Sequence, residues 1–201
     1  MLERDPIRFA KVLWPQVSFY DKQREVIYAI AESKELYVPA GNMLGKDFLA
    51  GYVALSFMLN PVMYIPEIAS NGTRRVVTTS VKDDHLRVLW GEIGRFITTS
   101  VRPLRWGEGG PLVVHHREIR RVVNGEIDKY SYLIGQVSEK GEGMSGHHAE
   151  YTMVIGDEAS ALDNQVYEAS QGWAKRMLFI GNPNPSDAFF KRHIMAGDVL
   201  A

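Results

Sequence analysis

The chain has 201 residues, a formal net charge of −1 and no cysteine. This length suits one domain with a sizeable core, and the lack of cysteine excludes a disulfide scaffold and any site that needs a thiol. The net charge is close to zero, so it gives no indication of nucleic-acid binding, and any such contact would depend on local patches.

Hydrophobic periodicity predicts helices and strands that alternate along most of the chain. The helical patterns cover residues 7–14, 22–31, 47–59, 82–99 and 163–173. The strand patterns cover residues 34–38, 75–79, 111–114, 118–123, 130–137, 152–156 and 176–181. This alternation predicts an α/β fold in a single domain, residues 1–201, with helices flanking a mainly parallel central sheet.

Three local features refine this prediction. Asn124-Gly125 between two strand patterns indicates a β-hairpin, and the Gly-rich, polar segment 138–148 indicates a loop. The longest apolar stretch, residues 48–65, is interrupted by Asn60-Pro61 and is too mixed to span a bilayer. We therefore expect a buried helix there and no membrane association.

The segment that follows the first predicted strand has the character of a phosphate-binding loop. It reads Ala40, Gly41, Asn42, Met43, Leu44, Gly45, Lys46 and Asp47, and a helical pattern comes next. Glycines let backbone N–H groups surround an anion, the helix adds its positive end, and Lys46 adds a full charge near the outer phosphates. The match to G-x-x-x-x-G-K-[ST] is imperfect at Ala40 and Asp47. The alternative is a Gly-containing turn with a surface lysine.

Two carboxylates, Asp157 and Glu158, end the apolar strand pattern 152–156. A pair in this position suits metal-assisted phosphoryl transfer, in which the first acid holds Mg²⁺ and the second polarises the attacking water. The alternative is that the pair only starts a helix, because acids favour helix N-termini. A phosphate loop upstream in the same α/β pattern favours the catalytic interpretation.

A third polar position, Asn182, follows the apolar strand pattern 176–181 and precedes Pro183. Gly181 and Asn182 could sense a γ-phosphate, or they could belong to a turn, since Asn-Pro is a strong breaker. The segment leaves both interpretations open. All three motifs fall at the carboxyl ends of predicted strands, where parallel sheets bind ligands.

Taken together, the motifs resemble the N-terminal ATPase domain of a tailed-phage terminase large subunit, the motor that packages DNA into capsids. The resemblance is carried by residues 38–51, 76–80, 86–93, 143–150, 154–160 and 180–183, which are spread along most of the chain in the family's order. It implies a P-loop NTPase of the ASCE, RecA-like type, with Walker A and Walker B motifs, that hydrolyses ATP with Mg²⁺.

The resemblance also implies roles for individual residues. Gly41 to Lys46 would grip the phosphates, Asp157 would hold Mg²⁺, Glu158 with Lys46 would catalyse hydrolysis, and Gly181-Asn182 would couple hydrolysis to motion. Gln23 resembles the family's adenine-reading glutamine, although a solvated glutamine at a helix start is an equal alternative.

Partners follow from the same resemblance. They are double-stranded DNA, a portal protein and a small terminase subunit, met in the bacterial host cytoplasm at the procapsid portal. The chain would be monomeric in isolation and form a homo-oligomeric ring when assembled. The family's nuclease domain has no counterpart in this sequence, so we expect this chain alone not to cut DNA.

Two departures from the family pattern change the expected chemistry. Asp47 stands where a hydroxyl residue normally touches Mg²⁺, so it either contacts the ion itself or only caps its helix. Asn42 and Met43 stand where many members carry an arginine, so an activating arginine would come from elsewhere, for example from a neighbouring subunit.

Other polar clusters have simpler interpretations. The His115-His116 and His147-His148 pairs lack ligand spacing, so we expect no metal there. The charged run 117–121 favours a solvated edge strand over a DNA contact or a trans-activating role. Two alternative functions remain: a weakly hydrolysing nucleotide-binding or assembly module, and a helicase-like DNA remodeler that would need a second lobe.

Overall fold

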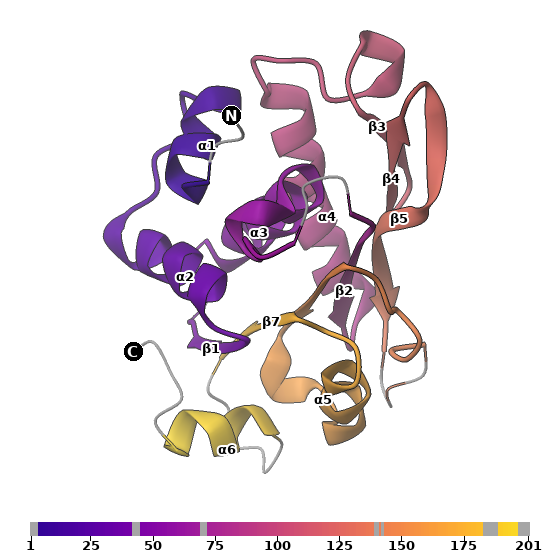
Figure 1. Cartoon of the computed structure of the whole chain (residues 1–201). Coiled ribbons are helices and arrows are strands. Elements are labelled where there is room, and N and C mark those ends of the chain that lie inside the picture. The colour runs from indigo at the N-terminus through magenta and orange to yellow at the C-terminus, as the bar shows by residue number, and fades with distance from the viewer. Residues whose placement is uncertain are drawn as a thin grey trace.

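The computed structural model describes residues 4–41, 45–68, 72–138, 141, 143–182 and 189–196. Helices pack against both faces of the parallel part of one seven-stranded sheet (Figure 1). The α-helices are α1 (Pro6–Leu13), α2 (Asp21–Glu32), α3 (Lys46–Leu59), α4 (Asp83–Thr99), α5 (Asn164–Gln171) and α6 (Phe189–Ala196). The strands are β1 (Glu35–Pro39), β2 (Arg74–Ser80), β3 (Leu112–His115), β4 (Glu118–Val123), β5 (Glu126–Val137), β6 (Tyr151–Asp157) and β7 (Arg176–Gly181).

The predicted mainly parallel sheet is confirmed. Its strand order is β1-β7-β6-β2-β5-β4-β3. The strands from β1 to β5 in this order run parallel, whereas β4 and β3 continue the sheet as antiparallel neighbours. Because β7 lies between β1 and β6, the carboxyl ends of all three strands meet at one edge of the sheet.

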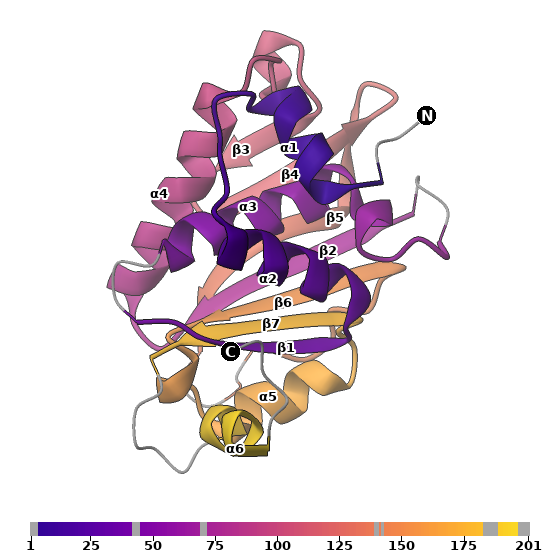
Figure 2. The same ribbon diagram turned by 90° about the vertical axis from the view of Figure 1, so that its left-hand side faces the viewer.

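Alternating residues along the parallel strands face two different helical layers, as the side-chain period of a strand requires. Val38 on β1 and Ile155 on β6 belong to the core beneath α2, α3 and α4. Tyr37 on β1 and Val154 on β6 belong to a second core that includes Phe189 of α6 and residues of α5. Figure 2 shows these two layers on opposite sides of the sheet.

Helix α3 is apolar on every side because the sheet and other helices surround it. All ten residues from 49 to 58 are buried. Gly51 lets α4 approach closely, since a Cβ there would lie 3.1 Å from the Cβ of Glu92. The buried helix expected in this stretch is confirmed, and it ends at Leu59 just before Pro61. Within the described residues, no helix combines the length and apolar character that crossing a membrane requires.

The antiparallel end of the sheet corrects one prediction. The Asn124-Gly125 hairpin is confirmed, with positive φ angles of 52° and 84° at the two turn residues. The charged run 117–121, however, does not form the edge strand. It lies in the turn before β4 and in β4 itself, which pairs with both β5 and β3, so β3 occupies the edge. Sequence alternation shows which residues share a face but not which strand is outermost.

Candidate active site

The phosphate-loop segment joins β1 to α3, as predicted. The backbone N–H of Ala40 donates to the carbonyl of Gly181 at 3.0 Å, so Ala40 extends the sheet and needs no glycine there. Gly45 has a φ of +66°, and a Cβ at this position would lie 2.9 Å from Nε2 of Gln23. These two facts explain a glycine before Lys46. Asn42, Met43 and Leu44 lie outside the described residues.

The acidic pair ends β6 and turns away from it sharply. Asp157 is the last residue of the strand and is 1% exposed. Glu158 has a left-handed backbone with φ 50° and precedes the short 3-10 helix Ala159–Ala161. Gly181 on the neighbouring strand makes room for this turn, because a Cβ there would lie 2.7 Å from the backbone nitrogen of Ala159. No α-helix starts at the pair, since α5 begins only at Asn164.

Lys46 brings the loop and the acidic pair together. Its ammonium group forms an ion pair with Oε1 of Glu158 and lies 3.6 Å from Oδ1 of Asp157. The side chains of Lys46, Asp157 and Glu158 are 10%, 2% and 15% exposed. These residues come from motifs 112 positions apart in the chain, yet they share one partly buried cluster.

The carboxylate of Asp157 is only partly satisfied, because Lys46 lies beside one of its oxygens but not the other. The pKa of the Asp157 carboxyl is raised from 3.8 to about 6; burial is the largest cause, Lys46 opposes it, Asp47 adds to it and His85 opposes it. Its Oδ2 is buried, with no hydrogen-bond partner among the described residues. The buried hydroxyl groups of Thr79 and Ser80, at the carboxyl end of the adjacent strand β2, also have no hydrogen-bond partner among the described residues. A buried oxygen of this kind normally has a water or an ion beside it.

These side chains fit a magnesium ion held together with a nucleotide. Mg²⁺ in phosphoryl-transfer sites is bound through one or two carboxylates, with waters and phosphates completing its shell. Asp157 offers a buried carboxylate oxygen, and Asp47 is near enough to influence its pKa. Across the described ranges, no group of three or more acidic, histidine or cysteine side chains could hold a metal alone. An ion here would therefore depend on phosphate ligands.

A cavity of about 200 Å³ opens beside Lys46. It lies between α2, β1, α3 and β7, and Gln23, Val26, Leu49 and Ile180 are among its lining residues. Gln23 is only 6% exposed, so the solvated interpretation of this glutamine is wrong. Its place in an apolar cavity next to the loop suits a planar base, and reading of adenine remains a prediction. Asn182 follows β7, between the loop and the acidic pair.

One residue of the cluster was not found from the sequence. His85, in the first turn of α4, places Nδ1 3.8 Å from Oε1 of Glu158, the same oxygen that Lys46 contacts. The available signal was its position five residues after the end of β2 at Ser80, which belongs to the edge of the sheet where ligands bind.

Two side chains of the remaining histidine and arginine clusters, His147 and Arg117, have local partners. His147 uses both ring nitrogens, one with the hydroxyl of Tyr132 at 2.6 Å and the other with the carbonyl of Gly143 at 2.8 Å. Arg117 binds the carboxylate of Asp83 through both terminal nitrogens.

Comparison with solved structures places this arrangement among known folds. The chain is similar to the large terminase ATPase domain of Thermus phage P74-26, with a TM-score of 0.66, 16% identity, and coverage of 95% of this chain and 74% of the other. The fold is that of the large terminase ATPase domains. The HK97 bacteriophage large terminase also matches, with a TM-score of 0.61, 12% identity, and coverage of 98% of this chain and 42% of the other.

Comparisons based on sequence, by contrast, find no match. No family model matches the chain, and no curated protein matches it either. At these low identities the structural likeness establishes the fold alone, and the mainly parallel sheet agrees with the prediction. The chain spans less than half the length of the HK97 protein.

Proposed function

We propose that this chain is the ATP-hydrolysing domain of a large-terminase-type motor that moves double-stranded DNA into a procapsid. One observation carries the proposal: Lys46, Asp157 and Glu158 converge at the carboxyl edge of the sheet, beside a cavity that could take a base. These three side chains are the ones that ATP hydrolysis on a P-loop needs.

Each group has a defined task in this proposal. Lys46 and the positive end of α3 bind the β- and γ-phosphates, and Gly45 shapes the loop around them. Glu158 takes the proton of the attacking water with its carboxylate. Asp157 and Asp47 would hold Mg²⁺, which when bound neutralises charge on the phosphates. Gln23 would read the base in the adjoining cavity, and Gly181-Asn182 would transmit the state of the phosphates along β7.

The partners of this domain belong to the same proposal. Double-stranded DNA, a portal protein, a small terminase subunit and further copies of the chain in a ring are the partners of a packaging motor in the host cytoplasm. The structural likeness to phage large terminases supports this set. We place DNA cleavage outside this domain.

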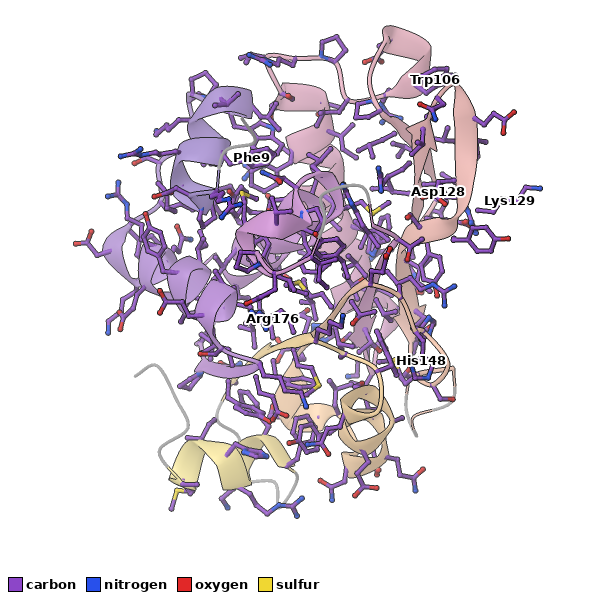
Figure 3. All side chains as sticks on the ribbon, viewed as in Figure 1. Phe9, Trp106, Asp128, Lys129, His148 and Arg176 are labelled. Carbon is purple, nitrogen blue, oxygen red and sulfur yellow. The ribbon has the colours of Figure 1, made fainter. Side chains whose placement is uncertain are left out.

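A Mg²⁺-dependent phosphate-release assay tests the proposal. Lys46→Ala is expected to abolish nucleotide binding or turnover while the fold stays intact, because the ammonium is lost where phosphates would bind. Lys129→Ala is the matched control, since Lys129 is exposed on β5 and projects away from the helices in Figure 3. Equal turnover in the wild type and Lys46→Ala would make the loop incidental.

A second function, nucleotide binding with little hydrolysis, is favoured by one contact. The ammonium of Lys46 is bound to Glu158, which neutralises the proposed base. Asp47 at the hydroxyl position of the motif points the same way. The two functions differ in the effect of Glu158→Ala: it removes Mg²⁺-dependent phosphate release from an ATPase and leaves a binding module unchanged.

A further inference from the structure

His85 contacts the proposed catalytic base from a third structural element. Lys46 reaches Glu158 from α3, and His85 reaches it from the first turn of α4. His85 is 38% exposed, so its ring contributes little to the core. Packing of the core therefore does not explain the position of His85, and we look for its role in the candidate active site.

The first turn of α4 is anchored, which fixes where His85 stands. Arg117, in the turn between β3 and β4, binds Asp83 through both terminal nitrogens and also donates to the backbone carbonyl of Asp83 at 3.3 Å. Asp83 is two residues before His85. Arg117 in turn accepts a backbone hydrogen bond from Gly135 of β5 at 3.0 Å. Arg117 thus ties the first turn of α4, which carries His85, to strand β5.

Lys46 and His85 approach the same atom, Oε1 of Glu158. Lys46 forms the closer contact, and Nδ1 of His85 lies at 3.8 Å, slightly beyond hydrogen-bonding distance. A polyphosphate in the loop is a stronger attraction for the ammonium than one carboxylate, because it carries more negative charge. When Lys46 turns to the phosphates, Oε1 becomes available to the next donor, and His85 is already beside it.

We propose that His85 is a positioning residue for Glu158, which hydrogen-bonds Oε1 through Nδ1–H when Lys46 engages the phosphates. This inference rests on the proposed ATPase function. A carboxylate held at Oε1 presents Oε2 to water in a fixed orientation, whereas a carboxylate that has lost Lys46 without replacement rotates freely. His85 does not touch the nucleotide and acts only through Glu158.

The proposal separates catalytic rate from binding. His85→Ala is expected to lower kcat by about 10- to 100-fold, the usual loss when a partner that orients a catalytic group is removed. Its KM and its dissociation constant for a fluorescent ATP analogue should stay within about twofold of the wild type, because the phosphate loop is untouched.

Three further variants make the result decisive. His85→Asn keeps an N–H donor close to the place of Nδ1 and should restore most of kcat, whereas His85→Leu fills similar space without a donor and should not. Asp84→Ala is the control for the helix turn, because Asp84 is the adjacent residue, is 78% exposed and pairs only with Arg87 among the described residues. It should match the wild type in kcat. Circular dichroism should show the same fold for every variant.

The outcomes divide cleanly. Loss of kcat in His85→Ala and His85→Leu with recovery in His85→Asn supports the proposal. A normal kcat in His85→Ala, an effect on nucleotide binding instead of kcat, or failure of His85→Asn to recover would each overturn it. If wild type itself shows no Mg²⁺-dependent turnover, the proposed ATPase function has failed, which is a different result from an active wild type that is indifferent to His85.

Discussion

The two ends of the central sheet treat charged groups in opposite ways. In the parallel part, β6 is buried at every position and β7 at all but its first, so charge is confined to the strand ends. In the antiparallel part, most positions of β4 and β5 are exposed or half-exposed, and charged residues lie within β4 and within the first four residues of β5. Parallel strands are covered on both faces, while an antiparallel edge can face water on one side.

The difference extends to how those charges are satisfied. At the parallel end, Asp157 keeps a buried oxygen without a hydrogen-bond partner among the described residues. At the antiparallel end, Arg120 binds Glu118 and the carbonyl of Lys129, and Arg121 donates to the carbonyl of Gly72. A site that handles phosphates and a cation needs unsatisfied groups, whereas a solvated surface can pair its charges locally. We expect substitutions at the two ends to separate function from stability.

The largest expected effect concerns the missing arginine. The arginines at the antiparallel end are held by neighbouring groups, and residues 40–47 contain no arginine. An activating arginine is worth about 10³–10⁵ in rate, so the chain alone should hydrolyse ATP slowly and speed up by a comparable factor in an assembled ring. Steady-state ATPase rates across a range of chain concentrations, with and without a portal, measure this. A fast rate that is independent of concentration would place the arginine within the chain.

The next effect tests the parallel end directly. Glu158→Gln should retain ATP binding and lose about 10²- to 10⁴-fold in kcat, because it removes the proposed base and leaves the phosphate loop intact. Glu126→Gln, an exposed acid at the start of β5, is the control and should behave as wild type. Weaker binding with an unchanged maximal rate would show that Glu158 has a different role.

Stability against pH contrasts one aspartate from each end. Burial raises the pKa of Asp157 from 3.8 to about 6, so the stability contributed by its neutral form is complete below pH 3.8 and is lost as the pH rises through 6. Asp157→Asn should therefore raise the free energy of unfolding at pH 8 by about 1–3 kcal/mol without nucleotide or Mg²⁺, and the gain should vanish near pH 4.

Asp128 on β5 should show the opposite sign. Burial raises its pKa, but hydrogen bonds from Ser131 and Tyr130 outweigh burial, so the net pKa is lowered. The stability it contributes is present above its unfolded pKa and is lost as the pH falls through the folded value. Asp128→Asn should lower the free energy of unfolding at pH 8. Thermal or urea melts of both variants at pH 4 and pH 8 check the pair, and shifts of the same sign would remove the contrast.

The role of Asp47 predicts a smaller effect. If Asp47 helps to hold Mg²⁺, Asp47→Ala should weaken nucleotide binding by about tenfold with Mg²⁺ and much less with EDTA. Removing a side chain that supports a bound metal typically has an effect of about this size. Fluorescence titration with an ATP analogue in both buffers measures the difference. Equal losses in the two buffers would leave Asp47 as a helix cap only.

The smallest expected effect lies at the antiparallel end. Gly125 has a φ of +84° in the β4–β5 hairpin, and nothing stands within 4 Å of an added Cβ. Gly125→Ala should therefore cost about 1 kcal/mol of stability through backbone strain alone. Its kcat should equal that of wild type, and a large change in turnover would mean that the two ends of the sheet are coupled.

The sequence by itself determined the local pieces of this protein. Period-two and helical patterns, with breakers such as Asn124-Gly125 and Pro61, predicted most helices and strands to within a few residues. They also placed Lys46 at the start of a helix and Asp157 at the end of a strand. These signals are local, because a turn residue or a hydrophobic period acts over only a few neighbouring positions.

Only the tertiary structure decided how those pieces meet. The insertion of β7 between β1 and β6, the position of β3 at the edge and the approach of His85 to Glu158 depend on pairings between distant segments. Strand order follows from packing of both sheet faces and from crossover connections, which leave no mark at any single position of the chain. The motif residues could therefore be predicted one by one, whereas the shared oxygen of Glu158 follows only from the folded arrangement.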